Sequence, residues 1–337
     1  MPPSQTREEE LKYYHEISEP IDEATFAHHN SLIKPIRLLN ADPNRDYAPL
    51  VQFIRRILVH LTVSSKYCTG TIGSYTMMLW IMRRTPKGKV AMQSLYPNSG
   101  DEVLSYVLPY IRETPPAIVL EDRTPPECSW GSWRNNEIVI SRELVTTYLN
   151  LEKSKATLDS DDERCLVFLQ TIILVTFLHE LTHTLMNRIF MGRLGSFFEC
   201  GDNVRDIGEH LERSLFTDSV LYVEWLRADF EDPNPKFQVK KIRSICSQPV
   251  ETGEGFHSVL VEDLRTMLDS IDRSELFSPV FLLQDAKPSD IISADSEHIR
   301  LRITPEYSLP VLNQWAMPLP VTEIGPDSII IEPACGR

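Results

Sequence analysis

Apolar residues recur at helical spacing in several stretches of the chain. From residue 49 onward the apolar positions are spaced three and four apart, which predicts an amphipathic helix. The stretch 165–190 is apolar on nearly all sides, which predicts a buried central helix. Two more helices are predicted over 204–226 and 258–271. The apolar positions of the first helix are Leu50, Phe53, Ile54, Ile57, Leu58 and Leu61.

Short apolar runs bounded by proline or polar turns predict strands. One lies within 113–127, a second covers 137–140, and others are expected in 297–303 and 328–333. Ser141 can cap a helix that follows the second strand. The segment 192–203 is predicted as a loop. The fold class is therefore α+β and helix-rich in the middle, with an N-terminal extension (1–48), a central domain (49–232) and a C-terminal segment of mixed helix and strand (233–337) that packs on it.

Composition and charge narrow the functional classes. With 34 Lys and Arg against 48 Asp and Glu, the net charge is −14, which disfavours binding to nucleic acid. The charged N-terminus lacks the apolar stretch of a secretory signal. The most apolar run, 165–178, is shorter than the roughly 20 residues that cross a bilayer. We therefore expect a cytoplasmic protein without a membrane partner, whose six scattered cysteines are small buried residues or free thiols and not disulfides.

His179, Glu180 and His183 form an HExxH motif on the predicted central helix. At positions i and i+4 the two imidazoles share one helical face, which suits two ligands of one zinc ion. Glu180 points about 100° away, where it can take a proton from a water that the metal activates. The alternative is a hydrogen-bonded polar cluster in the core, but burying three polar groups without strong partners is costly. The motif therefore favours zinc.

A catalytic zinc needs a third protein ligand. The metzincin signature HExxHxxGxxH is absent, because Met186 and Ile189 stand where its glycine and third histidine would be. The ligand must then come from elsewhere. The downstream candidates are Glu199, Cys200, Asp202, Asp206, Glu209, His210 and Glu212.

Helical geometry selects among these candidates. In a helix over 204–226, Glu212 borders the apolar stripe, whereas Asp206 and Glu209 lie near the opposite face. Gly208, one turn before Glu212, allows close approach to the HExxH helix. We expect Glu212 to be the third ligand, with Glu209 next. The stripe consists of Val204, Ile207, Leu211 and Leu215.

The HExxH motif and the downstream segment 208–212 together resemble the metal site of the thermolysin-type gluzincins. In that family a later helix carries a glutamate four residues after a glycine, as Glu212 follows Gly208 here, although the gap from HExxH is longer in this chain. The resemblance implies a zincin-like fold, in which a small mixed sheet with an edge strand packs on the buried HExxH helix. The family's aspartate four residues after the ligand is replaced by Phe216, so Asp206, Glu209 or Asp218 would have to take its supporting role.

The resemblance also implies two further parts of the site. An edge strand upstream of the active helix pairs with the substrate backbone, and 137–140 stands in that order, although it also suits an ordinary core strand. A Tyr or His stabilises the oxyanion, and the candidates are His257, Tyr222 and Tyr307.

The predicted function is zinc-dependent hydrolysis of a peptide bond in a peptide or peptide-like substrate. His179, His183 and Glu212 would hold one Zn²⁺ per chain, Glu180 would act as the general base, and His257 would assist. One alternative is a zinc enzyme that tailors a peptide-like or amide metabolite. Another is a non-catalytic protein with a structural zinc, which the presence of Glu180 disfavours. The oligomeric state does not follow from the sequence.

Overall fold

The computed structural model describes residues 23–62, 110–123, 125, 129–134, 136–189, 197–200, 203–216, 219–231, 239–249, 255–272, 291–292 and 297–304. The chain divides into two units, Met1–Glu306 and Tyr307–Arg337, and all described residues lie in the first. The apolar stretch 74–82 and the strand predicted in 328–333 lie outside the described residues.

The first sheet has four strands in the order β1-β2-β4-β3. β1, β2 and β4 are parallel, whereas β3 folds back antiparallel on β4 as a hairpin. Four of the five residues of β4 are buried, which makes it an interior strand with β2 on one side and β3 on the other. The strands are β1 (Leu38–Leu39), β2 (Ala117–Glu121), β3 (Gly131–Arg134) and β4 (Glu137–Ser141).

The expectation that 137–140 forms the edge strand is therefore wrong, and the alternative of an interior strand is confirmed. Among the described strands the edge belongs to β3, because 131–134 fold back and cover that side of β4. Part of the expected N-terminal extension also joins this sheet, since β1 pairs with β2.

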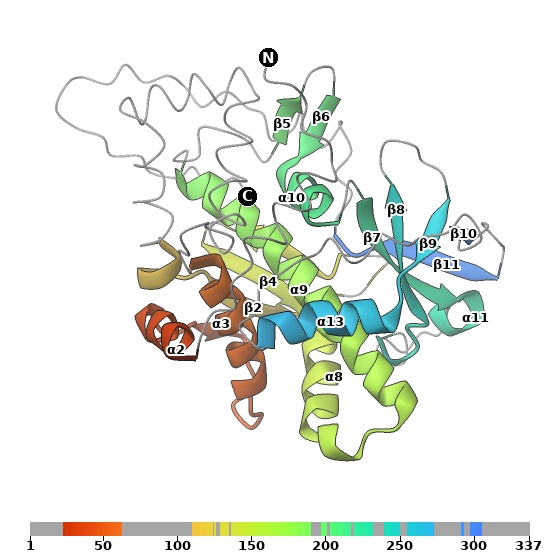
Figure 1. Ribbon diagram of the computed structural model, residues 1–337, viewed down its shortest axis with the longest axis horizontal. Coiled ribbons are helices and arrows are strands. Elements are labelled where there is room, and N and C mark those ends of the chain that lie inside the picture. Colours follow the sequence, from red (N-terminus) through yellow and green to blue (C-terminus); the bar gives the residue numbers. More distant parts are fainter. Residues whose placement is uncertain are drawn as a thin grey trace. The chain divides into compact units, whose positions relative to one another are not determined.

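The central helix is α9 (Ser160–Ile189), which packs against helices and the first sheet together (Figure 1). Its first turn is capped by Asp159, whose carboxylate accepts from the backbone N–H groups of Asp161 and Asp162. As predicted, α9 is buried on nearly all sides. Its neighbours include α8 (Arg142–Lys153), α10 (Ile207–Leu215), α13 (Val261–Asp272), β3 and β4.

Other helices expected from the sequence are also present. α3 (Ala48–Thr62) buries its predicted apolar stripe, and α13 falls within the expected segment 258–271 apart from its last residue. Ser141 caps α8 through its side chain, which accepts from the N–H of Leu144. The remaining short helices are α2 (Glu23–Leu32) and α11 (Arg227–Phe230).

The second sheet joins the expected central domain (49–232) to the C-terminal segment. Its order is β10-β9-β8-β7-β11, and every described pair in it is antiparallel. The expected boundary at 232 thus falls between the paired strands β7 and β8. The strands are β7 (Ser219–Leu226), β8 (Ser244–Pro249), β9 (Phe256–Ser258), β10 (Ile291–Ile292) and β11 (His298–Arg302).

The single helix predicted over 204–226 is wrong. The segment forms strand β6 (Asn203–Asp206), helix α10 and strand β7 in succession. Asp206 has extended backbone angles and caps α10 (Ile207–Leu215), and Phe216 is the C-cap at its other end. Six of the eight residues of β7 are buried, and they lie on both faces of the strand, as suits a strand between β8 and β11. The loop predicted over 192–203 is also corrected, because β5 (Phe197–Cys200) pairs with β6 as a hairpin.

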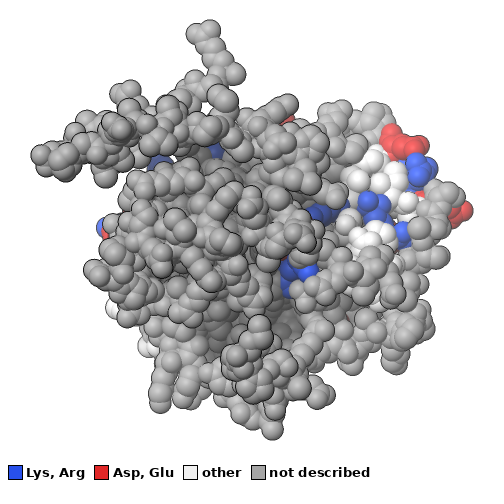
Figure 2. Space-filling view, turned by 90° about the horizontal axis from the view of Figure 1, so that it is seen from above, with Lys and Arg blue, Asp and Glu red and all other residues white. Residues whose placement is uncertain are grey.

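Two properties bear on location and partners. α9 is long and apolar enough to cross a membrane by length and composition, but 94% of its apolar window is buried inside the protein, as in the core helix of a soluble protein. The coloured, described surface in Figure 2 carries basic and acidic side chains beside each other. A cytoplasmic location without nucleic-acid or membrane partners stays a prediction.

Candidate metal centre

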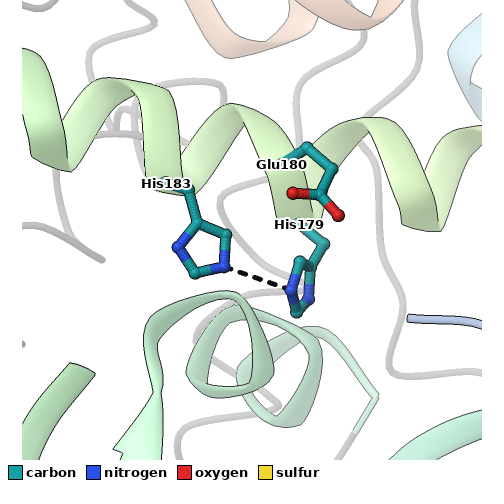
Figure 3. Close-up of side chains that lie close together, drawn as sticks. All are labelled: His179, Glu180 and His183. Carbon is teal, nitrogen blue, oxygen red and sulfur yellow. Dashed lines mark hydrogen bonds between the residues drawn. The ribbon is translucent and has the colours of Figure 1, made fainter. Parts of the chain in front are cut away.

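His179, Glu180 and His183 lie together on α9, as the HExxH spacing predicts. Both imidazoles project from the same side of the helix, with Glu180 beside them (Figure 3). All three side chains are buried, and their metal-binding atoms lie within 4.8 Å of one another. The Nε2 atoms of the two histidines are 3.2 Å apart. The structure therefore brings the predicted general base and two predicted ligands to one buried point.

The edge strand β3 passes directly beside this group. The indole of Trp133 lies nearly parallel to the His183 ring, with 5.7 Å between ring centroids. A Cβ atom added to Gly131 would lie 2.2 Å from Cγ2 of Thr176 and 3.5 Å from Cγ of Glu180. Only glycine lets β3 approach α9 so closely at this position. β3 thus forms one wall of the site.

A second wall comes from β6 and α10. Asp206, the last residue of β6, places its Oδ1 atom 3.2 Å from Nε2 of His179 and its Oδ2 atom 3.2 Å from Nε2 of His183. The same Oδ1 atom accepts from the N–H of Glu209. A Cβ added to Gly208 would lie 2.3 Å from Nδ1 of His179, so the close approach expected at this glycine is confirmed.

Glu212 reaches the site from α10 on the other side of the His179 ring. The Nδ1–H of His179 donates to Oε1 of Glu212 over 2.7 Å. A carboxylate only accepts, so this contact places the proton on Nδ1 and leaves the Nε2 lone pair of His179 available for a metal. Glu212 is buried, as expected, but it lies at Nδ1 and not beside the converging Nε2 atoms.

Residues from β11 and just beyond it hold Glu212 in place. The hydroxyl of Thr304 donates to Oε1 of Glu212 over 2.6 Å. Arg302 places one Nη2 atom 3.6 Å from the same oxygen and donates through Nη1 to Glu209 over 3.0 Å. Glu209 is half-buried and forms an ion pair with Arg302, the same side chain that lies near Glu212.

Burial and charge shift the pKa values of these groups. Burial raises the pKa of Glu180, although both histidines oppose the shift. Burial alone would lower the pKa of His179, but Asp206 and the hydrogen bond to Glu212 outweigh it and raise the pKa to about 9. Burial disfavours the charge of Asp206, yet His183 and His179 hold its pKa well below the usual range. The carboxylates thus require positive charge between them.

A zinc ion fits these residues. Zinc–nitrogen bonds of about 2.0–2.1 Å in a tetrahedron place ligand atoms about 3.3 Å apart, and the two Nε2 atoms are 3.2 Å apart. Within the described part of the chain, neither buried oxygen of Glu180 has a hydrogen-bond partner. Three buried carboxylates also converge on two imidazoles that could otherwise carry only protons. A divalent cation supplies the missing charge without protonating the histidines.

Four of the other candidates for the third ligand have side chains that lie outside what the structure describes. Glu199 and Cys200 belong to β5 and His210 to α10, but their side chains lie outside what the structure describes, as does Asp202 altogether. Glu212 as a metal ligand and the choice of zinc stay predictions.

The candidates for the oxyanion lie on the second sheet or outside the description. His257 stands on β9, opposite Ser247 of β8, and its Nδ1 atom is buried without a hydrogen-bond partner among the described residues. No described hydrogen bond, ion pair or ring contact joins His257 to the HExxH residues. Tyr222 stands on β7 opposite Arg302, and Tyr307 lies outside the described residues. A catalytic role for any of them stays a prediction.

Sequence reasoning missed the position of Asp206. An aspartate followed three residues later by a glutamate, as Asp206 is by Glu209, is a helix-start signal that would have placed the beginning of α10 correctly. No comparable local signal joins Trp133, Arg302 or Thr304 to the motif, because each reaches the site only through the fold.

No known protein family, curated protein or solved structure matches this chain.

Proposed function

We propose that the protein is a zinc-dependent hydrolase that cleaves peptide bonds in peptide or peptide-like substrates. His179 and His183 bind the metal through Nε2, and Glu180 is the general base. The proposal depends on the burial and proximity of His179, Glu180 and His183 on one helix, an arrangement compatible with zinc chemistry.

The observation that carries the proposal is the state of Glu180. Its carboxylate is buried beside two imidazoles, and neither oxygen is hydrogen-bonded within the described structure. A buried carboxylate without partners is costly if its role is structural. A carboxylate that exchanges a proton with a reacting molecule, by contrast, must keep its oxygens free of other partners. For the same reason, a purely structural zinc is disfavoured, since it would need no base.

The chemistry follows from the positions of these groups. When bound, zinc polarises a substrate carbonyl and makes water a stronger nucleophile at neutral pH. Glu180 accepts a proton at a carboxylate oxygen as the water attacks, and then donates it to the leaving nitrogen. His179 is held in one orientation by the contact between its Nδ1 and Glu212. Its burial and that of His183 keep bulk solvent from the ligand atoms.

The edge strand supports a peptide substrate. β3 has β4 on one side and no partner strand on the other among the described residues, and it runs past His183 and Glu180. An extended chain can add to such an edge through main-chain hydrogen bonds. We therefore propose that β3, and not the interior strand at 137–140, pairs with the substrate backbone.

A polar cavity lies at the end of α9 beyond His183. It is lined by Tyr110, Thr114, Asn136, Asn187 and Arg188. Asn187 follows His183 by one helical turn, so it shares a helical face with that histidine. The cavity is a candidate for the binding of a polar substrate side chain.

The test compares the wild type with Glu180→Gln on a mixed peptide library, with cleavage followed by mass spectrometry. We expect the variant to retain zinc and its melting temperature while hydrolysis falls by several orders of magnitude, since only the proton acceptor is lost. Glu113→Gln is the matched control, because Glu113 is exposed and pairs with Lys34. Unchanged hydrolysis in Glu180→Gln would remove Glu180 from the mechanism and contradict the proposal.

A further inference from the structure

The contacts of the two carboxylates from the β6–α10 segment differ in kind. Asp206 faces the Nε2 atoms of both histidines, whereas Glu212 faces Nδ1 of His179. Two histidines that bind one ion must both direct a nitrogen lone pair at it, and here the converging nitrogens are the Nε2 atoms. Only Asp206 lies beside both of these atoms.

We infer that Asp206, and not Glu212, is the third metal ligand, and that Glu212 is a positioning residue for His179. The inference rests on the proposed zinc site and specifies its ligands.

Distances support the role of Asp206. Its two oxygens are each 3.2 Å from one Nε2 atom, and the Nε2 atoms are themselves 3.2 Å apart. These values are close to the separation of about 3.3 Å expected between ligands on a tetrahedral zinc ion. The carboxylate is 6% exposed, so water does not screen it. Two imidazoles and one carboxylate complete a set of three protein ligands that leaves a fourth position open.

Local structure holds Asp206 in this orientation. It ends β6 and caps α10, and its Oδ1 atom accepts from the N–H of Glu209. The cap fixes the side chain at the start of the helix, and the absence of a Cβ at Gly208 lets that helix end contact the His179 ring. The cap and the close contact together direct the carboxylate to the histidines.

Glu212 has the contacts of an orienting partner. It accepts from Nδ1–H of His179 over 2.7 Å and from the Thr304 hydroxyl over 2.6 Å, with Arg302 nearby. Metal-bound histidines commonly donate their other ring N–H to a carboxylate, which fixes the ring and its tautomer. The partners of Glu212 come from the β11 region, which gives the distant segment 298–304 a part in the metal site.

The test uses two variants that change charge but little shape, Asp206→Asn and Glu212→Gln. Asparagine caps helices about as well as aspartate, so Asp206→Asn should preserve α10. Competition against a chromogenic chelator measures zinc affinity in each. We expect Glu212→Gln to lose up to the roughly 10–100-fold typical of orienting partners. We expect Asp206→Asn to lose more, because it removes an anionic ligand.

A second readout reports the ligands themselves. With Co²⁺ in place of zinc, the visible absorption bands should shift in Asp206→Asn and stay close to wild type in Glu212→Gln, and circular dichroism checks that both variants are folded. The inference is overturned if folded Glu212→Gln is the variant that releases zinc and changes the cobalt spectrum, or if Asp206→Asn matches wild type in both measurements. If wild type itself binds neither ion, the proposed function fails along with this inference.

Discussion

The α9 wall of the candidate metal centre and the wall facing it, formed by β6, α10 and the β11 region, differ in how their residues reach the site. On α9, a single motif of five residues supplies both histidines and Glu180, and the helix alone sets their spacing. On the opposite wall, Asp206 and Glu212 come from a strand end and a helix, and Arg302 and Thr304 come from a strand region far along the chain.

This difference separates local from non-local positioning. The HExxH group needs only helical geometry to form, whereas the facing carboxylates depend on the cap at Asp206 and on the close contact at Gly208. Changes on α9 should therefore abolish metal binding outright. Changes on the facing wall should weaken metal affinity, and the loss should be smaller the farther the changed residue lies from the Nε2 atoms.

The largest effect is expected from His179→Ala. The change removes one ligand and leaves Glu212 and Asp206 without the imidazole that both contact. Zinc content, measured by mass spectrometry of the purified protein, should fall to near zero and hydrolysis with it. The control is His60→Ala, since His60 is also buried but bonds to the carbonyl of Ile271. That variant should lose stability yet retain zinc, and equal zinc loss in both would indicate general unfolding.

A smaller effect is expected from Gly208→Ala, because the new Cβ would lie 2.3 Å from the His179 ring. Overpacking of this kind costs about 1–3 kcal/mol of unfolding free energy, and here it should also weaken zinc binding by displacing α10. Urea unfolding and chelator competition measure the two effects.

Gly131→Ala provides the comparison on β3, a third side of the site. Its Cβ would meet the side chain of Thr176 and not a histidine. We expect a similar loss of stability with a smaller change in zinc affinity. A larger loss of zinc affinity in Gly131→Ala than in Gly208→Ala would contradict the role given to α10.

The smallest effect is expected from Trp133→Leu. The indole stacks on His183 without contributing a ligand. Aromatic pairs contribute about 0.5–1.5 kcal/mol beyond buried area, which corresponds to a loss of roughly 2–10-fold in zinc affinity. Quenching of tryptophan fluorescence by added Co²⁺ should also decrease in the variant. A loss of more than 100-fold would mean that Trp133 does more than restrain the ring.

Much of the α9 wall follows from the sequence alone. The buried helix, the HExxH group, the strand β4 and the cap at Ser141 all depend on residues close together in the chain. The sequence also predicts a helix where α10 lies, but the predicted range of 204–226 includes the end of β6 and the whole of β7, whose apolar residues continue the pattern.

The errors have a common physical origin. Whether β4 lies inside a sheet depends on the hairpin with β3, and whether Asp206 faces a histidine depends on where α10 begins. Helical periodicity predicts the direction of a side chain only for residues inside a helix, and Asp206 lies just before α10. The contacts of Arg302 and Thr304 with α10 depend on pairing between β7 and β11, which no local pattern specifies.

The zinc content of the wild-type protein tests the central claim most directly. Protein purified without chelators should contain about one zinc per chain, because the two converging imidazoles and the facing Asp206 carboxylate are the three ligands of the proposed site. Dialysis against a strong chelator should remove the metal and abolish hydrolysis, and added Zn²⁺ should restore both. Folded wild-type protein that carries no transition metal and binds no added Zn²⁺ would contradict the account.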